Sequence, residues 1–166
     1  MKTLIYGAGT LGCLYAHRLF TAGKDVTILA RGKQRAFIEE NGVVLVNELT
    51  GVRESSEVPV VETVGEEDAY DLVVVLIRKN KLASVFEALS RCNRVQNILF
   101  MGNNSLGFDA YLNHLPAERV LFGFPGAGGS PKHGVVHYAD SEKPNGKRIP
   151  ITIGELDGKS RQRTKQ

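Results

Sequence analysis

Residues 2–31 read KTLIYGAGTLGCLYAHRLFTAGKDVTILAR, and this stretch decides the fold. An apolar run from Thr3 to Tyr6 comes before the glycine-rich segment GAGTLG. A segment with helical periodicity extends to Ala22, and a second apolar run occupies Val26 to Ala30. This order predicts a strand, a tight turn, a helix and a second strand, which together make one βαβ unit of about 30 residues.

The three glycines of the turn have different physical roles. Gly7 lets the chain turn sharply, Gly9 lets a pyrophosphate approach the backbone, and Gly12 lets the helix lie against the sheet. The helix also directs its free N–H groups and its positive dipole end toward the phosphates. A structural turn that binds nothing is the alternative, but the strand before and the helix after favour dinucleotide binding. The expected cofactor-binding residues of the turn are Gly7, Ala8, Gly9, Thr10, Leu11 and Gly12.

The end of the second apolar run indicates which dinucleotide binds. An NAD site commonly has Asp or Glu there, about 20 residues after the glycines, to bind the ribose 2′-hydroxyl. This chain instead has Arg31, followed by Lys33 and Arg35. A guanidinium group binds a 2′-phosphate well, whereas a carboxylate would repel it. The sequence therefore predicts NADP(H), with Arg31 at the 2′-phosphate. The alternative is that Arg31 and Lys33 are solvated charges in a loop.

Composition and charge exclude several classes of protein. The chain has 166 residues, 42% apolar and 23% charged, which is typical of one soluble domain. It contains no 18-residue apolar run, and the glycine turn comes too early for a signal peptide. The net charge of +3 arises from residues 157–166, which contain no aromatic side chain to stack on bases. We therefore expect a cytoplasmic protein with no membrane or nucleic-acid partner.

Metal and disulfide sites are not expected either. Cys13 and Cys92 lie far apart and have no partner pattern, so both are expected to be free thiols. The four histidines lack the spacing of zinc ligands, which predicts no metal site.

The remaining elements extend the first unit into a doubly wound α/β sheet, parallel at first, with antiparallel strands at the C-terminal end. Continuous apolar runs predict buried strands at 72–77, 98–101 and 120–124. Helices are expected at 33–41 and 82–89, with a short one ending at Leu115. Shorter strands are expected at 43–46, 52–57 and 60–61. Residues 125–131 are expected to form a glycine-rich loop, and 135–138 should pair with 149–153 as a hairpin around 144–146.

Three polar or glycine-rich loops follow expected parallel strands, at 7–12, 78–81 and 102–107. Ligands of such sheets bind beyond the carboxyl ends of the strands, so these loops are expected to form one site. Together with Ala30-Arg31-Gly32 and Asn103-Asn104-Ser105-Leu106-Gly107, they resemble the ketopantoate reductase family over nearly the whole chain. The resemblance implies a Rossmann-like fold and the NADPH-dependent reduction of 2-dehydropantoate to pantoate, a step toward pantothenate.

The resemblance also assigns residues in the later loops. Asn104 falls where the family has an asparagine close to the nicotinamide and the substrate, although Ser105 replaces the glycine that usually follows. Arg78 occupies the place of a family lysine, which leaves a related 2-keto acid open as the substrate. Ala127 lies in a segment that resembles the backbone beside the nicotinamide. These three residues complete the expected cofactor site, and no residue of the chain is a convincing proton donor.

The family's second half is a helical domain that supplies a catalytic lysine, an asparagine and an acidic residue. We therefore expect residues 1–156 to be the NADP(H)-binding domain and 157–166 to be a basic tail that starts a linker or helix toward that domain. On this interpretation the chain alone is inactive, and a small 2-keto acid binds when the second domain is present. A non-catalytic NADP(H)-binding module is the competing hypothesis, and the sequence does not decide whether a homodimer forms.

Overall fold

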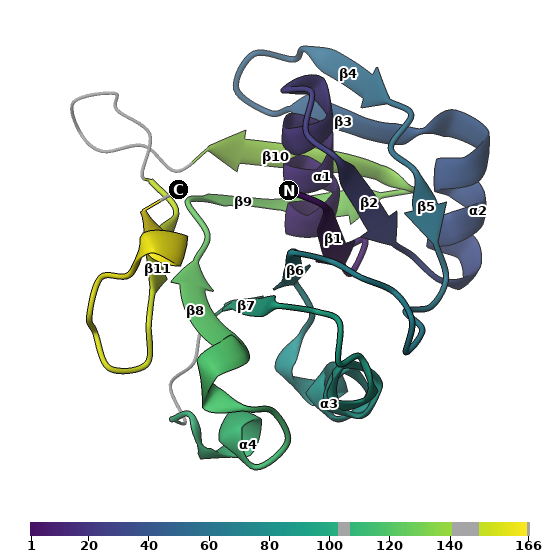
Figure 1. The fold of residues 1–166 in the computed structure, drawn as a ribbon. Helices are drawn as coiled ribbons and strands as arrows, with labels where there is room; N and C mark the ends of the chain where they lie inside the picture. Colours follow the sequence, from purple (N-terminus) through teal and green to yellow (C-terminus); the bar gives the residue numbers. More distant parts are fainter. Residues whose placement is uncertain (103–106, 141–149, 166) are drawn as a thin grey trace.

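The computed structural model describes residues 1–102, 107–140 and 150–165, and these residues form two sheets (Figure 1). The larger sheet has seven strands in the order β11-β8-β7-β6-β1-β2-β5. All neighbouring pairs are parallel except β11 with β8, which are antiparallel. The strands are β1 Thr3–Tyr6, β2 Val26–Leu29, β5 Val60–Val61, β6 Leu72–Val75, β7 Asn97–Met101, β8 Val120–Phe124 and β11 Thr152–Gly154.

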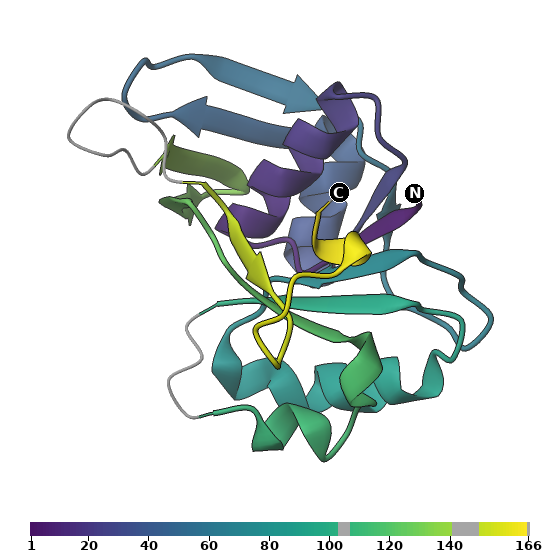
Figure 2. The same cartoon turned by 60° about the vertical axis from the view of Figure 1, so that its left-hand side comes forward.

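Helices cover both faces of this sheet, as Figure 2 shows, with α1 on one side and α3 on the other. Apolar residues at helical spacing, Val85, Phe86 and Leu89, bury the inner side of α3 against the sheet. Helix α2 ends at Gly42, whose φ of 72° and N–H bond to the Ile38 carbonyl form a glycine C-cap. The helices are α1 Thr10–Thr21, α2 Gly32–Asn41, α3 Leu82–Arg91 and α4 Asp109–Leu112, with 3-10 turns η1 Lys79–Lys81, η2 Ala117–Arg119 and η3 Gln162–Thr164.

The smaller sheet has four strands in the order β4-β3-β10-β9, and it packs on the other side of α1. Its central pair, β3 and β10, is parallel, and its two outer pairs are antiparallel. Helix α1 is therefore enclosed between two sheets, and one apolar core joins Ile5, Leu14 and Leu45 across the three layers. The strands are β3 Val43–Asn47, β4 Arg53–Ser56, β9 Ala127–Lys132 and β10 Val135–Asp140.

This architecture confirms the predicted α/β class and corrects two details of the C-terminal half. The expected hairpin of 135–138 with 149–153 is wrong, because β10 pairs with β9 and β3 while β11 pairs with β8. The turn predicted at 144–146 lies outside the described residues. The expected loop at 125–131 is largely strand β9, and a side chain at Gly129 would overlap the His137 carbonyl oxygen. The glycines therefore permit close strand pairing here.

Arg163 of the basic tail packs at the amino ends of β7 and β8, next to Glu155, which follows β11. Arg163 binds the buried carboxylate of Glu155, and its guanidinium donates to the Asn97 side-chain oxygen at 3.0 Å and to the Glu118 carbonyl. Whether residues 157–166 lead into a further domain stays a prediction. No helix within the described ranges is long and apolar enough to cross a membrane.

Candidate dinucleotide site

The glycine turn connects β1 to α1 with the geometry that each glycine was expected to provide. Gly7 has a φ of 117°, which only glycine adopts readily. A Cβ atom at Gly12 would overlap the Gly7 carbonyl oxygen, so a side chain there would push α1 away from the sheet. Gly9 is the N-cap of α1, and among the described residues that are not its immediate neighbours along the chain, no atom lies within 4 Å of the place where its Cβ would be. The turn therefore presents open space in front of the helix N-terminus.

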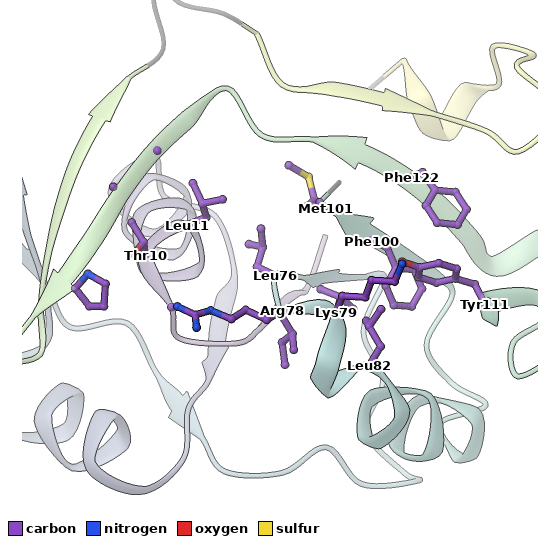
Figure 3. A pocket seen from close by; sticks show the side chains of 17 residues that line it. Thr10, Leu11, Leu76, Arg78, Lys79, Leu82, Phe100, Met101, Tyr111 and Phe122 are labelled. Carbon is purple, nitrogen blue, oxygen red and sulfur yellow. The ribbon is translucent and has the colours of Figure 1, made fainter. Parts of the chain in front are cut away.

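A cavity of about 560 Å³ lies along the carboxyl ends of the strands (Figure 3). At one end it is bounded by Thr10 and Leu11 of α1, toward which the Arg78 side chain extends. At the other end the side chains are aromatic and come from β7, α4 and β8, namely Phe100, Tyr111 and Phe122. Leu76 and Met101 lie between the two ends, as do the backbones that follow β6 and β7. The glycine turn after β1, the segment after β6 and Gly102 after β7 thus line one cavity, while residues 103–106 of the third predicted loop lie outside the described residues.

Arg31 is not among the residues that line this cavity; it follows β2, and its hydrogen-bond partners come from the carboxyl ends of β1 and β5. Its Nε donates a hydrogen bond to the Glu62 carbonyl oxygen at 3.1 Å, and its Nη2 donates to the Tyr6 hydroxyl oxygen at 3.3 Å. Tyr6 is the last residue of β1 and immediately precedes Gly7. The guanidinium group is therefore held beside the glycine turn, where the ribose of a dinucleotide would lie if its pyrophosphate occupied the turn.

The other predicted residues differ in how directly they contribute to the cavity. Arg78 lines it, whereas Ala127 packs against the core and its neighbours Gly128 and Gly129 form the wall. Ala8 also packs against the core, and its carbonyl accepts a hydrogen bond from the thiol of Cys13. Asn104 lies outside the described residues.

Sequence reasoning missed the aromatic end of the cavity and two contacts of Arg31. Tyr111 packs in the core with its neighbour Phe100 at a ring distance of 4.8 Å. Tyr6 and Glu62 carried no signal of their own, because their importance depends on β1 and β5 lying on either side of β2. A correct strand order would have indicated both, since residues at the ends of neighbouring parallel strands meet.

The charged side chains that line the cavity within the described residues are Arg78 and Lys79, so its charge is positive. Neither Arg78 nor Lys79 forms an ion pair within the part of the chain that the structure describes, and no carboxylate from that part lines the cavity. Burial raises the pKa of the Tyr111 hydroxyl, and it raises the pKa of the Cys13 thiol on α1 to about 12, so both groups stay protonated and uncharged at neutral pH. Among the described residues no cluster of His, Cys, Asp or Glu has the geometry of a metal site. The cations Arg78 and Lys79 suit this site to binding an anion.

The parallel sheet, the glycine turn and the cavity beside it define a nucleotide-binding domain of the Rossmann type. Comparison with known proteins identifies the family. Residues 3–148 match the model of the family described as "Ketopantoate reductase PanE/ApbA". The chain therefore belongs to the ketopantoate reductase family.

Individual relatives agree with this assignment. The 2-dehydropantoate 2-reductase of Bacillus subtilis is 36% identical over 104 residues, which are 62% of this chain and 33% of that protein. The crystal structure of the probable 2-dehydropantoate 2-reductase PanE from Bacillus subtilis superposes with a TM-score of 0.73 at 25% identity, covering 95% of this chain and 50% of that one. D-mandelate dehydrogenase, solved with NADH and anilino(oxo)acetate, shares the fold at 20% identity, with a TM-score of 0.73 over 94% of this chain and 49% of its own. The chain thus spans half or less of each of these relatives.

Proposed function

We propose that this chain is the NADPH-binding part of a reductase that converts 2-dehydropantoate to pantoate in the pantothenate pathway. Membership of the ketopantoate reductase family supports the reaction class. The observation that carries the choice of cofactor is the position of Arg31, which Tyr6 and Glu62 hold beside the glycine turn. A cation at the carboxyl end of β2 suits the 2′-phosphate of NADPH, where a carboxylate would suit NADH.

The residues of the site fit this cofactor. The open space at Gly9 gives a pyrophosphate access to the N–H groups of α1, and the helix dipole stabilises its charge. Arg31 holds the 2′-phosphate, and Arg78 lies where it can neutralise a phosphate or a substrate carboxylate. Asn104 and Ala127 are assigned to the vicinity of the nicotinamide by the family resemblance. When bound, the nicotinamide supplies the hydride, and these protein groups bind and orient it.

We propose further that residues 1–156 form the cofactor domain and that 157–166 lead toward the helical domain implied by the family resemblance. The product alkoxide requires a proton, and the family resemblance assigns the catalytic lysine, an asparagine and an acidic residue to that helical domain. We therefore assign that role to the second domain and expect the chain alone to bind cofactor without turnover. The homodimer that the sequence left undecided is tested by sedimentation of the full-length gene product.

A different 2-oxo acid is the second candidate for the substrate. Two observations favour it: Arg78 replaces the lysine of the family pattern, and Phe100, Tyr111 and Phe122 make one end of the cavity aromatic. The fold is shared with D-mandelate dehydrogenase, which was solved with an aromatic oxo acid, anilino(oxo)acetate. Aromatic walls bind an apolar substrate group more strongly than a hydroxylated one.

The test compares the two substrates with the full-length gene product. NADPH oxidation is followed by absorbance with 2-dehydropantoate and, separately, with an aromatic 2-oxo acid such as phenylglyoxylate. A higher kcat/KM for 2-dehydropantoate supports the first assignment, and a higher value for phenylglyoxylate supports the second. Nucleotide binding without turnover of either acid would instead favour the non-catalytic binding module.

A further inference from the structure

Glu62 lies beside Arg31 because of the strand order. It follows β5 directly, and β5 is the parallel neighbour of β2, with the Ala30 N–H donating to the Val61 carbonyl at 2.9 Å. The main chain of Glu62 then accepts the hydrogen bond from Arg31 Nε. Its side chain is a carboxylate at the same edge of the sheet, about half exposed to solvent. An acidic group thus lies next to the proposed 2′-phosphate subsite.

Arg35 is the partner of this carboxylate. It lies one turn beyond Arg31 on α2, and its Nη1 donates to Glu62 Oε2 while its Nε donates to Glu39 Oε1 at 2.9 Å. Two guanidinium groups therefore lie at the start of α2, and the second is engaged by carboxylates. A phosphate bound at Arg31 would compete with Glu62 for Arg35, because both anions require the same donors.

We infer that the Glu62–Arg35 pair sets the strength of the preference for NADPH over NADH. Glu62 weakens NADPH binding in two ways: it repels the dianionic 2′-phosphate, and it occupies a second arginine that would otherwise bind this phosphate. NADH carries a neutral 2′-hydroxyl group, so neither effect applies to it. The inference rests on the proposed NADP(H) site and adds a residue that moderates its selectivity.

The experiment is a fluorescence titration of NADPH and NADH against the unaltered protein and the variant Glu62→Gln. Glutamine keeps the size of the side chain and the main-chain carbonyl that binds Arg31, so only the charge is removed. We expect the Kd for NADPH to fall about three- to tenfold, while the Kd for NADH changes less than about twofold. Raising the ionic strength should narrow the difference, because the charges are exposed.

Two further variants separate this mechanism from a general charge effect. Arg35→Gln in the Glu62→Gln background should remove most of the gain for NADPH, since the freed arginine is then absent. Glu87→Gln removes the same charge from an exposed pair with Arg91 on α3 and should leave both Kd values unchanged. An equal gain from Glu87→Gln, an equal gain for both nucleotides, or an unchanged NADPH/NADH ratio in Glu62→Gln would each overturn the inference.

The failure of the inference can be distinguished from failure of the proposed function. If the unaltered protein binds neither nucleotide, or if Arg31→Ala leaves the preference for NADPH intact, the NADP(H) site itself is wrong, and this inference is wrong with it. If Arg31→Ala abolishes the preference and Glu62→Gln does not change it, only the role of Glu62 is refuted.

Discussion

The two cationic regions of the site differ in how firmly they are held. Arg31 is fixed by a hydroxyl group from β1 and a carbonyl after β5, and its neighbour Arg35 is paired with carboxylates. Arg78 extends along the cavity from a 3-10 turn and forms no ion pair within the described ranges. One region is therefore organised before any ligand arrives, and the other keeps its charge available.

This difference separates two kinds of contribution to binding. A prearranged guanidinium loses little conformational entropy when a phosphate binds, so it contributes selectivity for the group that fits it. An unpaired side chain on a flexible stem provides attraction for any anion in its reach, with less discrimination. We therefore expect mutations at the Arg31 region to change the ratio of NADPH to NADH affinity. Mutations at Arg78 should change both affinities together.

The largest expected effect lies at the glycine turn, which both regions require. Gly9→Val should raise the Kd of both nucleotides by about 100-fold or more, because a branched side chain would fill the space that the pyrophosphate needs. The backbone of Gly9, with φ −81° and ψ −170°, suits any residue, and its surroundings are open, so the variant should stay folded. Isothermal titration measures the affinities, and circular dichroism checks the fold.

Gly12→Ala is the matched comparison within the same turn. Its Cβ would overlap the Gly7 carbonyl oxygen, so the expected result is a loss of stability of about 1–3 kcal/mol, measured by urea unfolding. Tight nucleotide binding by a folded Gly9→Val variant would contradict the assignment of the pyrophosphate to this turn.

Arg31→Ala should have the next largest effect, and it should act on one nucleotide only. Removal of a charge-assisted phosphate contact is expected to raise the Kd for NADPH by about 10- to 100-fold, while the Kd for NADH changes little. Lys33→Ala is the control, because Lys33 is the nearest exposed cation along α2 and takes part in no ion pair with the described residues. A similar loss for both variants would mean that general positive charge, rather than Arg31, selects the cofactor.

The sequence predicted the larger sheet well because its signals are local. Continuous apolar runs identified β6, β7 and β8, and Gly42 marked the end of α2. The sequence predicted the strands β3, β4 and β10, but not their assembly into a second sheet, because this depends on β3 pairing with β10 far along the chain, Leu45 opposite Val136. The alternation in β10 shows which face is buried but does not name the neighbouring strand.

The same distinction applies to the site. The spacing from the glycines predicted Arg31 at the 2′-phosphate, which stays a prediction; the structure shows its guanidinium donating to the hydroxyl of Tyr6, the residue before the turn. Tyr6 reads in sequence as one more apolar strand residue, and its hydroxyl gains a partner only when β1 and β2 lie side by side. Glu62 follows a two-residue edge strand that carries almost no periodic signal. To predict contacts between the ends of neighbouring strands, one therefore needs the strand order as well as the glycine motif.

Arg78→Ala tests the second cationic region, whose guanidinium forms no ion pair with the described residues. We expect both NADPH and NADH to bind about two- to fivefold more weakly, with an unchanged ratio, because the charge attracts a group that the two nucleotides share. Arg78→Lys should restore most of the affinity, since it keeps the charge and provides the residue of the family pattern. The same titrations give the result. A change confined to NADPH would place Arg78 at the 2′-phosphate and remove the contrast between the two regions.

Tyr6→Phe has the smallest expected effect and tests the organisation of Arg31 most directly. The hydroxyl oxygen accepts a hydrogen bond from Arg31 Nη2, and the ring is buried, so the variant removes one acceptor without altering packing. A less ordered guanidinium group should raise the Kd for NADPH by about two- to fivefold and leave the Kd for NADH unchanged. The effect should vanish in an Arg31→Ala background.

Tyr70→Phe is the matched control, because Tyr70 is a buried tyrosine of the same core cluster, and the side-chain hydrogen bonds of Arg31 go to Tyr6 and Glu62 instead. If Tyr6→Phe weakened both nucleotides equally, or if its effect persisted without Arg31, the hydroxyl would act through the stability of β1. In that case the hydrogen bonds of Arg31 would be a consequence of packing at the end of β1. The prearranged guanidinium group would then not explain the preference for NADPH.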